Sequence, residues 1–163
     1  HRLGVLGVTQ IGWKVRPAEL VDVTSLVDFN CAIALETEGK DLDRPTVERG
    51  VRRGLEQGDE VQYFVADDGQ QPIGSLMLTR EWSDWRDGWL VWVQSVYVKP
   101  THRGQGVFRS LLEQVIQQIR QQPDVVGVRL YGEADNTRAQ TVYARTGFVD
   151  PRYKVLEQIF PPK

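Results

Sequence analysis

Apolar and polar positions form separate blocks along the chain, and the spacing within each block predicts one element. Runs rich in β-branched and aromatic residues predict strands at 13–16, 61–66, 71–80, 89–99 and 125–131. Apolar residues at helical spacing predict helices over 18–38, 44–57, 107–119 and 135–146. A final strand is expected from Phe148 through Tyr153 to Phe160.

Residues that begin or end elements mark the boundaries between these blocks. Pro17 suits the first turn of a helix, and Gly147 suits a helix end. Either Asp135 or Asn136 suits a helix N-cap. The segment from Glu81 to Gly88 is predicted to be a polar loop. The order β-α-α-β-β-β-α-β-α-β-β predicts one mixed α/β (α+β) domain over the whole chain, with flanking helices and a central sheet of about six to seven strands.

Composition narrows the class of protein. The chain has 163 residues, 40% of them apolar and 26% charged, which is typical of a soluble globular domain. Its 20 basic and 22 acidic residues indicate no nucleic-acid partner. No apolar run is long enough to cross a bilayer and no signal-peptide layout is evident, so we expect no membrane partner. The single cysteine, Cys31, fits a reducing, cytoplasmic location, and with only two histidines we expect no metal site.

The stretch VYVKPTHRGQGVFRSLL, residues 96–112, places a polar, glycine-containing turn between a predicted strand and a predicted helix. The first backbone N–H groups of a helix bind phosphates well. Gly104 and Gly106 lack Cβ atoms and allow an anion to approach the backbone closely. Arg103 and Arg109 add donors for phosphate oxygens. The stretch therefore predicts a diphosphate-binding cradle, although an ordinary helix start after a glycine turn has the same local pattern.

A second stretch, NTRAQTVYARTGF at residues 136–148, carries another set of spaced residues. Asn136, Ala139 and Tyr143 share one face of the predicted helix. Gly147 and Phe148 follow where that helix is expected to end.

Together the two stretches resemble the GNAT superfamily of acyl-CoA-dependent N-acetyltransferases. The first matches a strand ending in Val, then Pro, then Arg-x-x-Gly; the second matches Asn-x-x-Ala-x-x-x-Tyr-x-x-x-Gly-Phe in full. The resemblance implies acetyl-CoA as co-substrate and acetyl transfer, by direct attack, to a primary amine of a small acceptor. The residues that it assigns to acetyl-CoA binding are Val96, Tyr97, Val98, Arg103, Gly104, Gln105, Gly106, Val107, Phe108, Arg109, Asn136 and Tyr143.

The same resemblance implies roles in the reaction. The pantetheine arm would lie between the 89–99 and 125–131 strands and pair with the backbone at Val96 and Val98. A backbone N–H near Val96 would hold the thioester oxygen. Tyr143 would act as general acid toward the leaving thiolate. Asn136 would bind the CoA arm, cap its helix, or do both.

Gln94 stands where many family members carry the glutamate that serves as base. Gln94 would orient a water, and Glu36 or Glu38 is the alternative base. Phe108 stands where the family usually has Gly or Ala, and we expect it to pack beside Leu111 and Leu112.

The acceptor site is the least defined part of the sequence. Trp82 and Trp85, with Asp84, Asp87, Glu36 and Glu38, would line a pocket for a cationic amine. The tryptophans would otherwise cover the sheet edge or a dimer contact, since homodimers are a family tendency. Two further alternatives remain, namely a non-catalytic acyl-CoA-binding sensor or interaction module and transfer of another acyl group or to oxygen.

Overall fold

The computed structural model describes residues 12–132 and 136–163. The chain forms two compact units, His1–Tyr131 and Gly132–Lys163, and each is described by itself.

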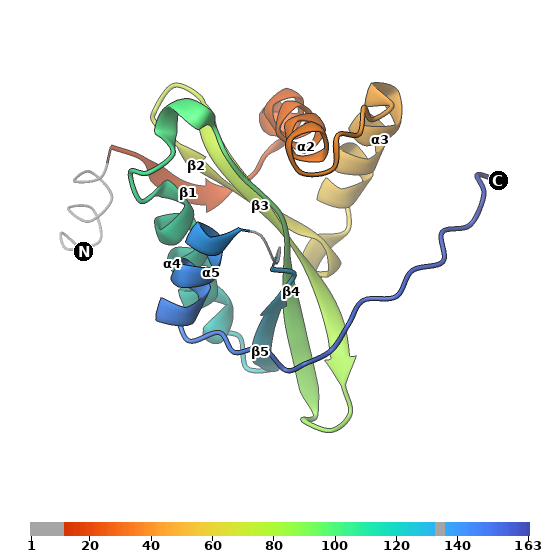
Figure 1. The fold of residues 1–163 in the computed structure, drawn as a ribbon, viewed down its shortest axis with the longest axis vertical. Helices are drawn as coiled ribbons and strands as arrows, with labels where there is room; N and C mark the ends of the chain where they lie inside the picture. The colour runs from red at the N-terminus through yellow and green to blue at the C-terminus, as the bar shows by residue number, and fades with distance from the viewer. Residues whose placement is uncertain (1–11, 133–135) are drawn as a thin grey trace. The chain divides into compact units, whose positions relative to one another are not determined.

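The first unit is built on a five-stranded sheet in the order β1-β2-β3-β4-β5 (Figure 1). All neighbouring strands pair antiparallel except β4 and β5, which pair parallel. The strands agree with the first five predicted strands to within a few residues. Their bounds are β1 Lys14–Pro17, β2 Gln62–Asp67, β3 Pro72–Ser83, β4 Gly88–Val98 and β5 Val125–Leu130.

Helices connect these strands and, in the first unit, cover both faces of the sheet. The α-helices are α2 Val23–Glu38, α3 Arg44–Leu55 and α4 Val107–Arg120 in the first unit, and α5 Thr137–Arg145 in the second. Short 3₁₀ turns are η1 Leu20–Asp22, η2 Gly58–Glu60 and η3 Pro100–His102. The first predicted helix thus starts later than Ala18, because Pro17 ends β1 and a 3₁₀ turn precedes α2.

The core lies in two layers on either side of the sheet. On one face, Leu26 and Val27 of α2 pack with Val51 of α3 against Tyr63 and Val65 of β2. On the other face lies α4, whose buried stripe follows the predicted helical spacing: Val107, Leu111, Leu112, Val115 and Ile119. Figure 1 shows the sheet between α4 and the α2–α3 pair.

Gly74 of β3 marks the point where α4 begins against the sheet. A Cβ atom there would lie 3.6 Å from Val107 and 2.9 Å from the backbone oxygen of Tyr97. Because the second distance is shorter than real Cβ contacts, this position requires glycine.

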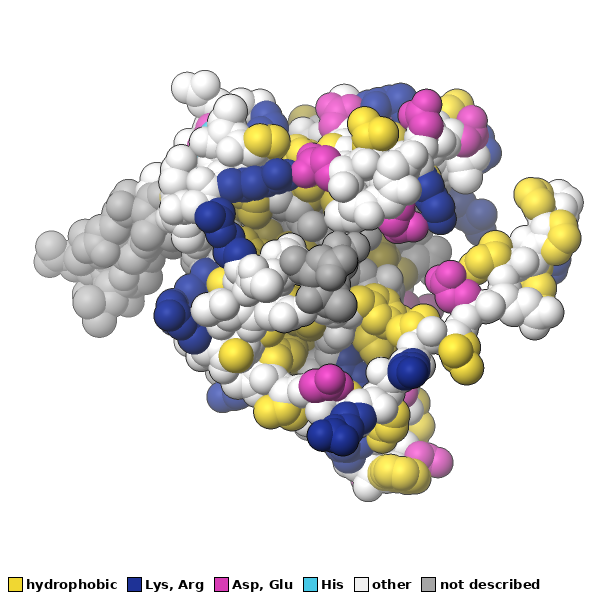
Figure 2. All heavy atoms as spheres, in the orientation of Figure 1, with side chains coloured by type: hydrophobic (Ala, Val, Ile, Leu, Met, Phe, Trp, Pro, Cys, Tyr) yellow, Lys and Arg dark blue, Asp and Glu magenta, His cyan; other side chains and the backbone are white. Residues whose placement is uncertain are grey.

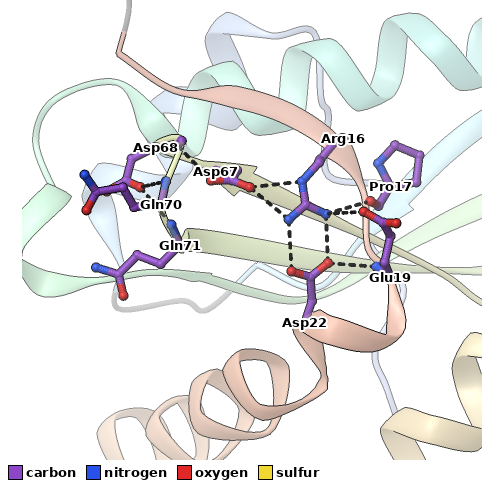
Figure 3. A network of polar contacts seen from close by, with 9 residues as sticks. Arg16, Pro17, Glu19, Asp22, Asp67, Asp68, Gln70 and Gln71 are labelled. Carbon is purple, nitrogen blue, oxygen red and sulfur yellow. Dashed lines mark hydrogen bonds and ion pairs between the residues drawn. The ribbon is translucent and has the colours of Figure 1, made fainter.

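A nearly buried ion-pair network ties β1, η1 and β2 together (Figure 3). Arg16 donates to both carboxylate oxygens of Asp22, at 2.8 and 2.9 Å, and to Asp67 at 2.9 and 3.1 Å. The Asp22 carboxylate also accepts the backbone N–H of Glu19 at 2.7 Å. Asp22 is only 3% exposed, so these bonds satisfy a charge that has left water.

The last predicted strand is wrong, so in the described residues the sheet has five strands rather than six to seven. Asp150 accepts the backbone N–H of Arg152 at 2.7 Å, and Arg152 has a positive φ of 65°. This turn, with Pro151 inside it, interrupts the predicted strand. Beyond it the apolar side chains of the second unit are exposed, as the yellow spheres along the C-terminal segment show (Figure 2).

Half of the predicted loop from Glu81 to Gly88 is strand. β3 continues to Ser83 and β4 starts at Gly88, which leaves a tight hairpin turn. Trp82 pairs with Trp89 across the two strands, and their rings meet edge to face at 5.0 Å. Cross-strand aromatic packing of this kind favours the paired state over a loop.

Among the described residues no helix combines the length and apolar character needed to cross a membrane.

Candidate functional site

The predicted cradle is a left-handed glycine turn at the start of α4. Gly104 and Gly106 have φ values of 77° and 90°, which L side chains rarely adopt. Gly106 is the N-cap of α4, and the backbone N–H of Ser110 makes a helical bond to its carbonyl at 2.9 Å. A Cβ atom on Gly106 would meet nothing within 4 Å, so this helix start faces open space. The turn therefore presents the positive end of a helix to an anion.

The strand before the cradle extends beyond the end of its neighbour β5. Pairing between β4 and β5 ends at Val93 and Leu130, whereas β4 continues along β3 to Val98. The backbone of β4 after Val93 is therefore not used in the ladder with β5. The gap expected for the pantetheine arm stays a prediction, because the pairing stops where β5 itself ends.

A β-bulge lies within this part of β4, which extends beyond β5. Met77 pairs with Gln94 and Ser75 pairs with Tyr97, so β4 has one residue more than β3 between these pairs. Ser95 adopts a positive φ of 52° to accommodate it. Bulges of this kind re-aim the backbone and are frequent beside active sites.

Sequence reasoning missed the bulge, and the apolar pattern of β4 carries no clear signal for it. Val91 and Val93 are buried at odd positions and Val98 at an even one, but Leu90 is also buried at an even position. Side chains of a regular strand alternate with period two, and this mixed pattern does not reveal where the extra residue lies.

The guanidinium of Arg103 turns toward α2 and β4. It donates to Glu36 at 2.9 Å and to the carbonyl of Val98 at 2.8 Å, and it lies 5.2 Å from the centre of the Tyr97 ring. The Tyr97 hydroxyl donates to the other Glu36 oxygen at 3.0 Å. Phe29 of α2 packs against the Tyr97 ring, and the centres of the two rings lie 5.2 Å apart.

We call Glu36, Tyr97 and Arg103 the α2 tether, because they join the end of α2 to β4 and the cradle. Burial and the bond to Glu36 raise the pKa of Tyr97, so its hydroxyl remains a donor at neutral pH. Within the tether Glu36 already accepts two hydrogen bonds, which lowers its suitability as a general base. Sequence reasoning named Glu36 and Arg103 as site residues but did not predict their contact, because 67 positions separate them in the chain.

The four residues predicted to bind the acceptor do not lie together. Glu36 contacts Tyr97 near the end of β4, whereas Trp82 contacts Trp89 near its beginning. Eight positions of a strand separate Tyr97 from Trp89, roughly 26 Å. Trp85 is 85% exposed in the hairpin turn, and Glu38 is exposed beside Lys40, at 3.1 Å.

The first unit holds three further predicted site residues, each with surroundings of its own: Gln94, Phe108 and Arg109. Gln94 lies just before the bulge and donates from its side-chain amide to the hydroxyl of Thr79. Phe108 is half-buried rather than part of the buried α4 stripe, one helical position away from Val107. Arg109 is exposed and pairs with Glu113 at 3.4 Å.

In the second unit, α5 displays the residues of the second stretch. The Asn136 side chain accepts the backbone N–H of Ala139 at 3.0 Å, which confirms it as the N-cap, whereas Asp135 lies outside the described residues. Gly147 has a φ of 92° and lets Phe148 donate its N–H to the Tyr143 carbonyl at 3.0 Å. The Tyr143 and Phe148 rings then meet edge to face at 5.9 Å. Burial raises the pKa of Tyr143, so its phenol is protonated at neutral pH.

Within the described parts of the chain, no three His, Cys, Asp or Glu side chains gather in a way that would hold a metal ion.

Known proteins share both this fold and parts of this sequence. A family model for the acetyltransferase (GNAT) family matches residues 29–148. The structure of a possible acetyltransferase from Clostridium difficile 630 is 32% identical, with a TM-score of 0.83 over 92% of this chain and 99% of that one. A structure of a predicted acetyltransferase with acetyl-CoA from Clostridium acetobutylicum shares the fold at 18% identity, with a TM-score of 0.71 over 89% of this chain and 96% of that one.

Streptothricin acetyltransferase of Escherichia coli is 32% identical over 79 residues, which are 48% of this chain and 42% of that protein. The chain thus matches less than half the length of this relative. The family model, in contrast, covers both motifs, the bulged strand and the cradle, and it confirms the resemblance seen in the sequence. This chain belongs to the acetyltransferase (GNAT) family, whose members use acetyl-CoA as acetyl donor.

Proposed function

We propose that this chain, over residues 1–163, is an N-acetyltransferase that moves the acetyl group of acetyl-CoA to a primary amine of a small acceptor. The observation that carries the proposal is the left-handed glycine turn at the open start of α4, after the bulged end of β4 that extends beyond β5. A relative named for streptothricin supports a small-molecule acceptor.

The first unit supplies the binding groups for acetyl-CoA in this proposal. Backbone amides from Arg103 to Arg109 bind the diphosphate, helped by the positive end of the α4 dipole. The β4 backbone beyond Val93 pairs with the pantetheine arm, with Val96 the main partner, because the Val98 carbonyl already accepts from Arg103. Arg103 acts by holding the cradle to α2 and β4 rather than as a direct phosphate ligand.

The reaction proposed is direct attack. The neutral amine nitrogen attacks the thioester carbonyl, forming the C–N bond, and the backbone N–H near Val96 stabilises the developing oxyanion. Collapse of the intermediate breaks the C–S bond, and the sulfur takes the phenolic proton of Tyr143. Tyr143 suits this role because burial keeps its phenol protonated.

The amine must also lose a proton. Gln94 is not a base, but Thr79 holds its side chain just before the bulge, and in this proposal Gln94 orients a water that carries the proton away. Asn136 is proposed to contact the CoA arm through its side-chain amide while its oxygen caps α5.

Titration of acetyl-CoA into the protein tests this function. We expect saturable binding that Gly106→Glu weakens at least tenfold, because the new carboxylate stands where the diphosphate binds. Gly58→Glu is the matched control: Gly58 also has a positive φ, 67°, and also faces open space, so it carries the same backbone strain away from the cradle. Equal weakening in both variants would show an effect of strain, and absence of binding to the unaltered protein would refute the proposal.

A second candidate is an acyl-CoA-binding module without catalysis. Gln94 favours this candidate, because a side-chain amide cannot accept the proton of an amine. Acetyl-CoA binding without transfer to any primary amine would support this candidate. Turnover at ordinary enzymatic rates would eliminate it.

A further inference from the structure

One polar and aromatic surface of the sheet adjoins Gln94, and apart from Gln94 and the Thr79 that holds it, its residues have no part in the proposed reaction. Thr79 pairs with Trp92, and Trp92 pairs with Arg129, so these side chains project from the same face. This is also the face on which Met77 packs against the α2–α3 cluster. The surface is formed by half-buried Thr79, Glu81, Trp92, Gln94 and Arg129 with exposed Tyr131, and we call it the sheet floor.

Hydrogen bonds and a ring contact hold the sheet floor in one arrangement. The Trp92 indole N–H donates to Glu81 at 2.7 Å, and Arg129 donates to both Glu81 oxygens at 3.0 and 3.1 Å. The rings of Trp92 and Tyr131 lie 4.6 Å apart at an angle of 32°. Residues fixed in this way present a rigid surface, which reduces the entropy cost of binding.

The position of the sheet floor connects it to the reaction. Gln94, at one end of the floor, directly precedes the bulge of β4, whereas Glu81 pairs with Leu90, four residues earlier. The opposite face of β4 is closed, because Val91 and Val93 are buried with α4 on that side. In the first unit, an acceptor that reaches the bulge must therefore approach over the sheet floor.

The charges of the floor indicate which acceptors fit. In the Glu81–Arg129 pair the glutamate side chain is 43% exposed and the arginine 24%, so the carboxylate is the end presented to solvent. The bond from Trp92 lowers the pKa of Glu81, with Arg129 contributing and slight burial opposing, so the carboxylate is charged at neutral pH. The faces of Trp92 and Tyr131 also attract cations rather than anions.

We propose that the sheet floor is the acceptor site and that it selects amines carrying a second positive charge, with the reacting nitrogen at Gln94 and the distal cation at Glu81. This inference rests on the proposed function and specifies its substrate class. Glu81 acts on binding, remote from the reacting atoms, so its removal should raise KM for the acceptor and leave kcat unchanged.

The test compares two straight-chain amines, octane-1,8-diamine and octylamine, which differ only in the distal amino group. Their kcat/KM values are measured with acetyl-CoA by mass detection of the acetylated amine. We expect the diamine to be favoured about tenfold, well beyond the factor of about two that two equivalent amines supply. Glu81→Gln keeps a hydrogen-bond acceptor for Trp92 and should reduce the preference to about two, through KM.

Two more variants separate recognition from support of the fold. Arg129→Gln releases the Glu81 carboxylate from its partner and should increase the preference for the diamine. Glu48→Gln makes the same charge change on the exposed surface of α3, where Glu48 pairs with Arg52, and should change nothing. A purely structural ion pair would instead lower kcat/KM for both amines equally in both floor variants.

Three results would overturn the inference: equal kcat/KM for the two amines, equal loss for both in Glu81→Gln, or no turnover of either amine while acetyl-CoA still binds. These results leave the cradle and the acetyl donor in place. Failure of the unaltered protein to bind acetyl-CoA would instead overturn the proposed function, and this inference with it.

Discussion

Replacement of Tyr143 by phenylalanine is expected to lower kcat about a hundredfold or more while the affinity for acetyl-CoA stays the same. Loss of a positioned general acid typically costs this much, because the thiolate must then leave without its proton. Phenylalanine keeps the ring, so the edge-to-face contact with Phe148 and the end of α5 are preserved. The measurement is steady-state kinetics on an amine that the unaltered protein acetylates, together with titration of acetyl-CoA.

The pH dependence of the same reaction gives an independent check on Tyr143. Since burial raises the pKa of Tyr143 above the ordinary value for a phenol, the acid form persists throughout the neutral range. Activity should therefore show no loss from this group below about pH 10, and the alkaline loss should vanish in Tyr143→Phe. Tyr153→Phe, an identical change at an exposed position of the second unit, serves as control. Full kcat in Tyr143→Phe would assign Tyr143 a packing role only.

Local sequence patterns predicted the elements that local forces determine. The apolar stripe of α4, the glycines of the cradle and the Asn136 cap each depend on residues a few positions apart. Helical spacing, positive φ and capping are short-range properties, so a single sequence reveals them. Gly147 of the second motif is also a short-range feature. It follows the end of α5 and allows the backbone N–H of Phe148 to donate to the carbonyl of Tyr143.

Contacts between distant segments could not be predicted in this way. Glu36 and Arg103 meet across 67 positions, and Glu81 and Arg129 across 48. Each pair depends on strand order and register, which no local pattern supplies. The predicted acceptor residues depend on strand pairing too: chemistry groups Trp82 and Trp85 with Glu36, whereas Trp82 of β3 pairs with Trp89 at the beginning of β4, far from Tyr97.

The predicted C-terminal strand failed for a related reason. Alternating apolar residues give a segment the propensity for a strand, but a strand also needs backbone partners and an uninterrupted path. The turn at Asp150 and Arg152 breaks that path. The extended hairpin of β3 and β4 is the opposite case, since polar residues that suggested a loop are held in strands by the Trp82–Trp89 contact.

Replacement of Asp22 by alanine is expected to lower the free energy of unfolding by about 3 kcal/mol, the largest stability effect that we anticipate. The substitution leaves the half-buried Arg16 guanidinium hydrogen-bonded to one carboxylate, Asp67, beside its longer ion pair with exposed Glu19 at 3.7 Å, and it removes the acceptor of the Glu19 N–H. For a chain of this size the melting temperature should fall by roughly 6–12 °C. Asp28→Ala is the matched control, because Asp28 pairs with Arg44 on the exposed surface and should cost under about 1 kcal/mol. Equal losses in the two variants would contradict a special role for burial.

The same network makes stability depend on pH. Burial of Asp22 opposes ionisation, but the bonds from Arg16 and the Glu19 backbone outweigh it and lower the pKa of the Asp22 carboxyl below its usual value. A group whose pKa is lowered by folding stabilises the folded state above its unfolded pKa, about 3.9 for aspartate, and loses this contribution as the pH falls through the folded value. Thermal unfolding followed from pH 7 to pH 2 should therefore show a steeper acid loss in the unaltered protein than in Asp22→Asn, which has no proton to gain. Parallel curves would mean that the network holds β1, η1 and β2 by hydrogen bonding alone, without the charge on Asp22.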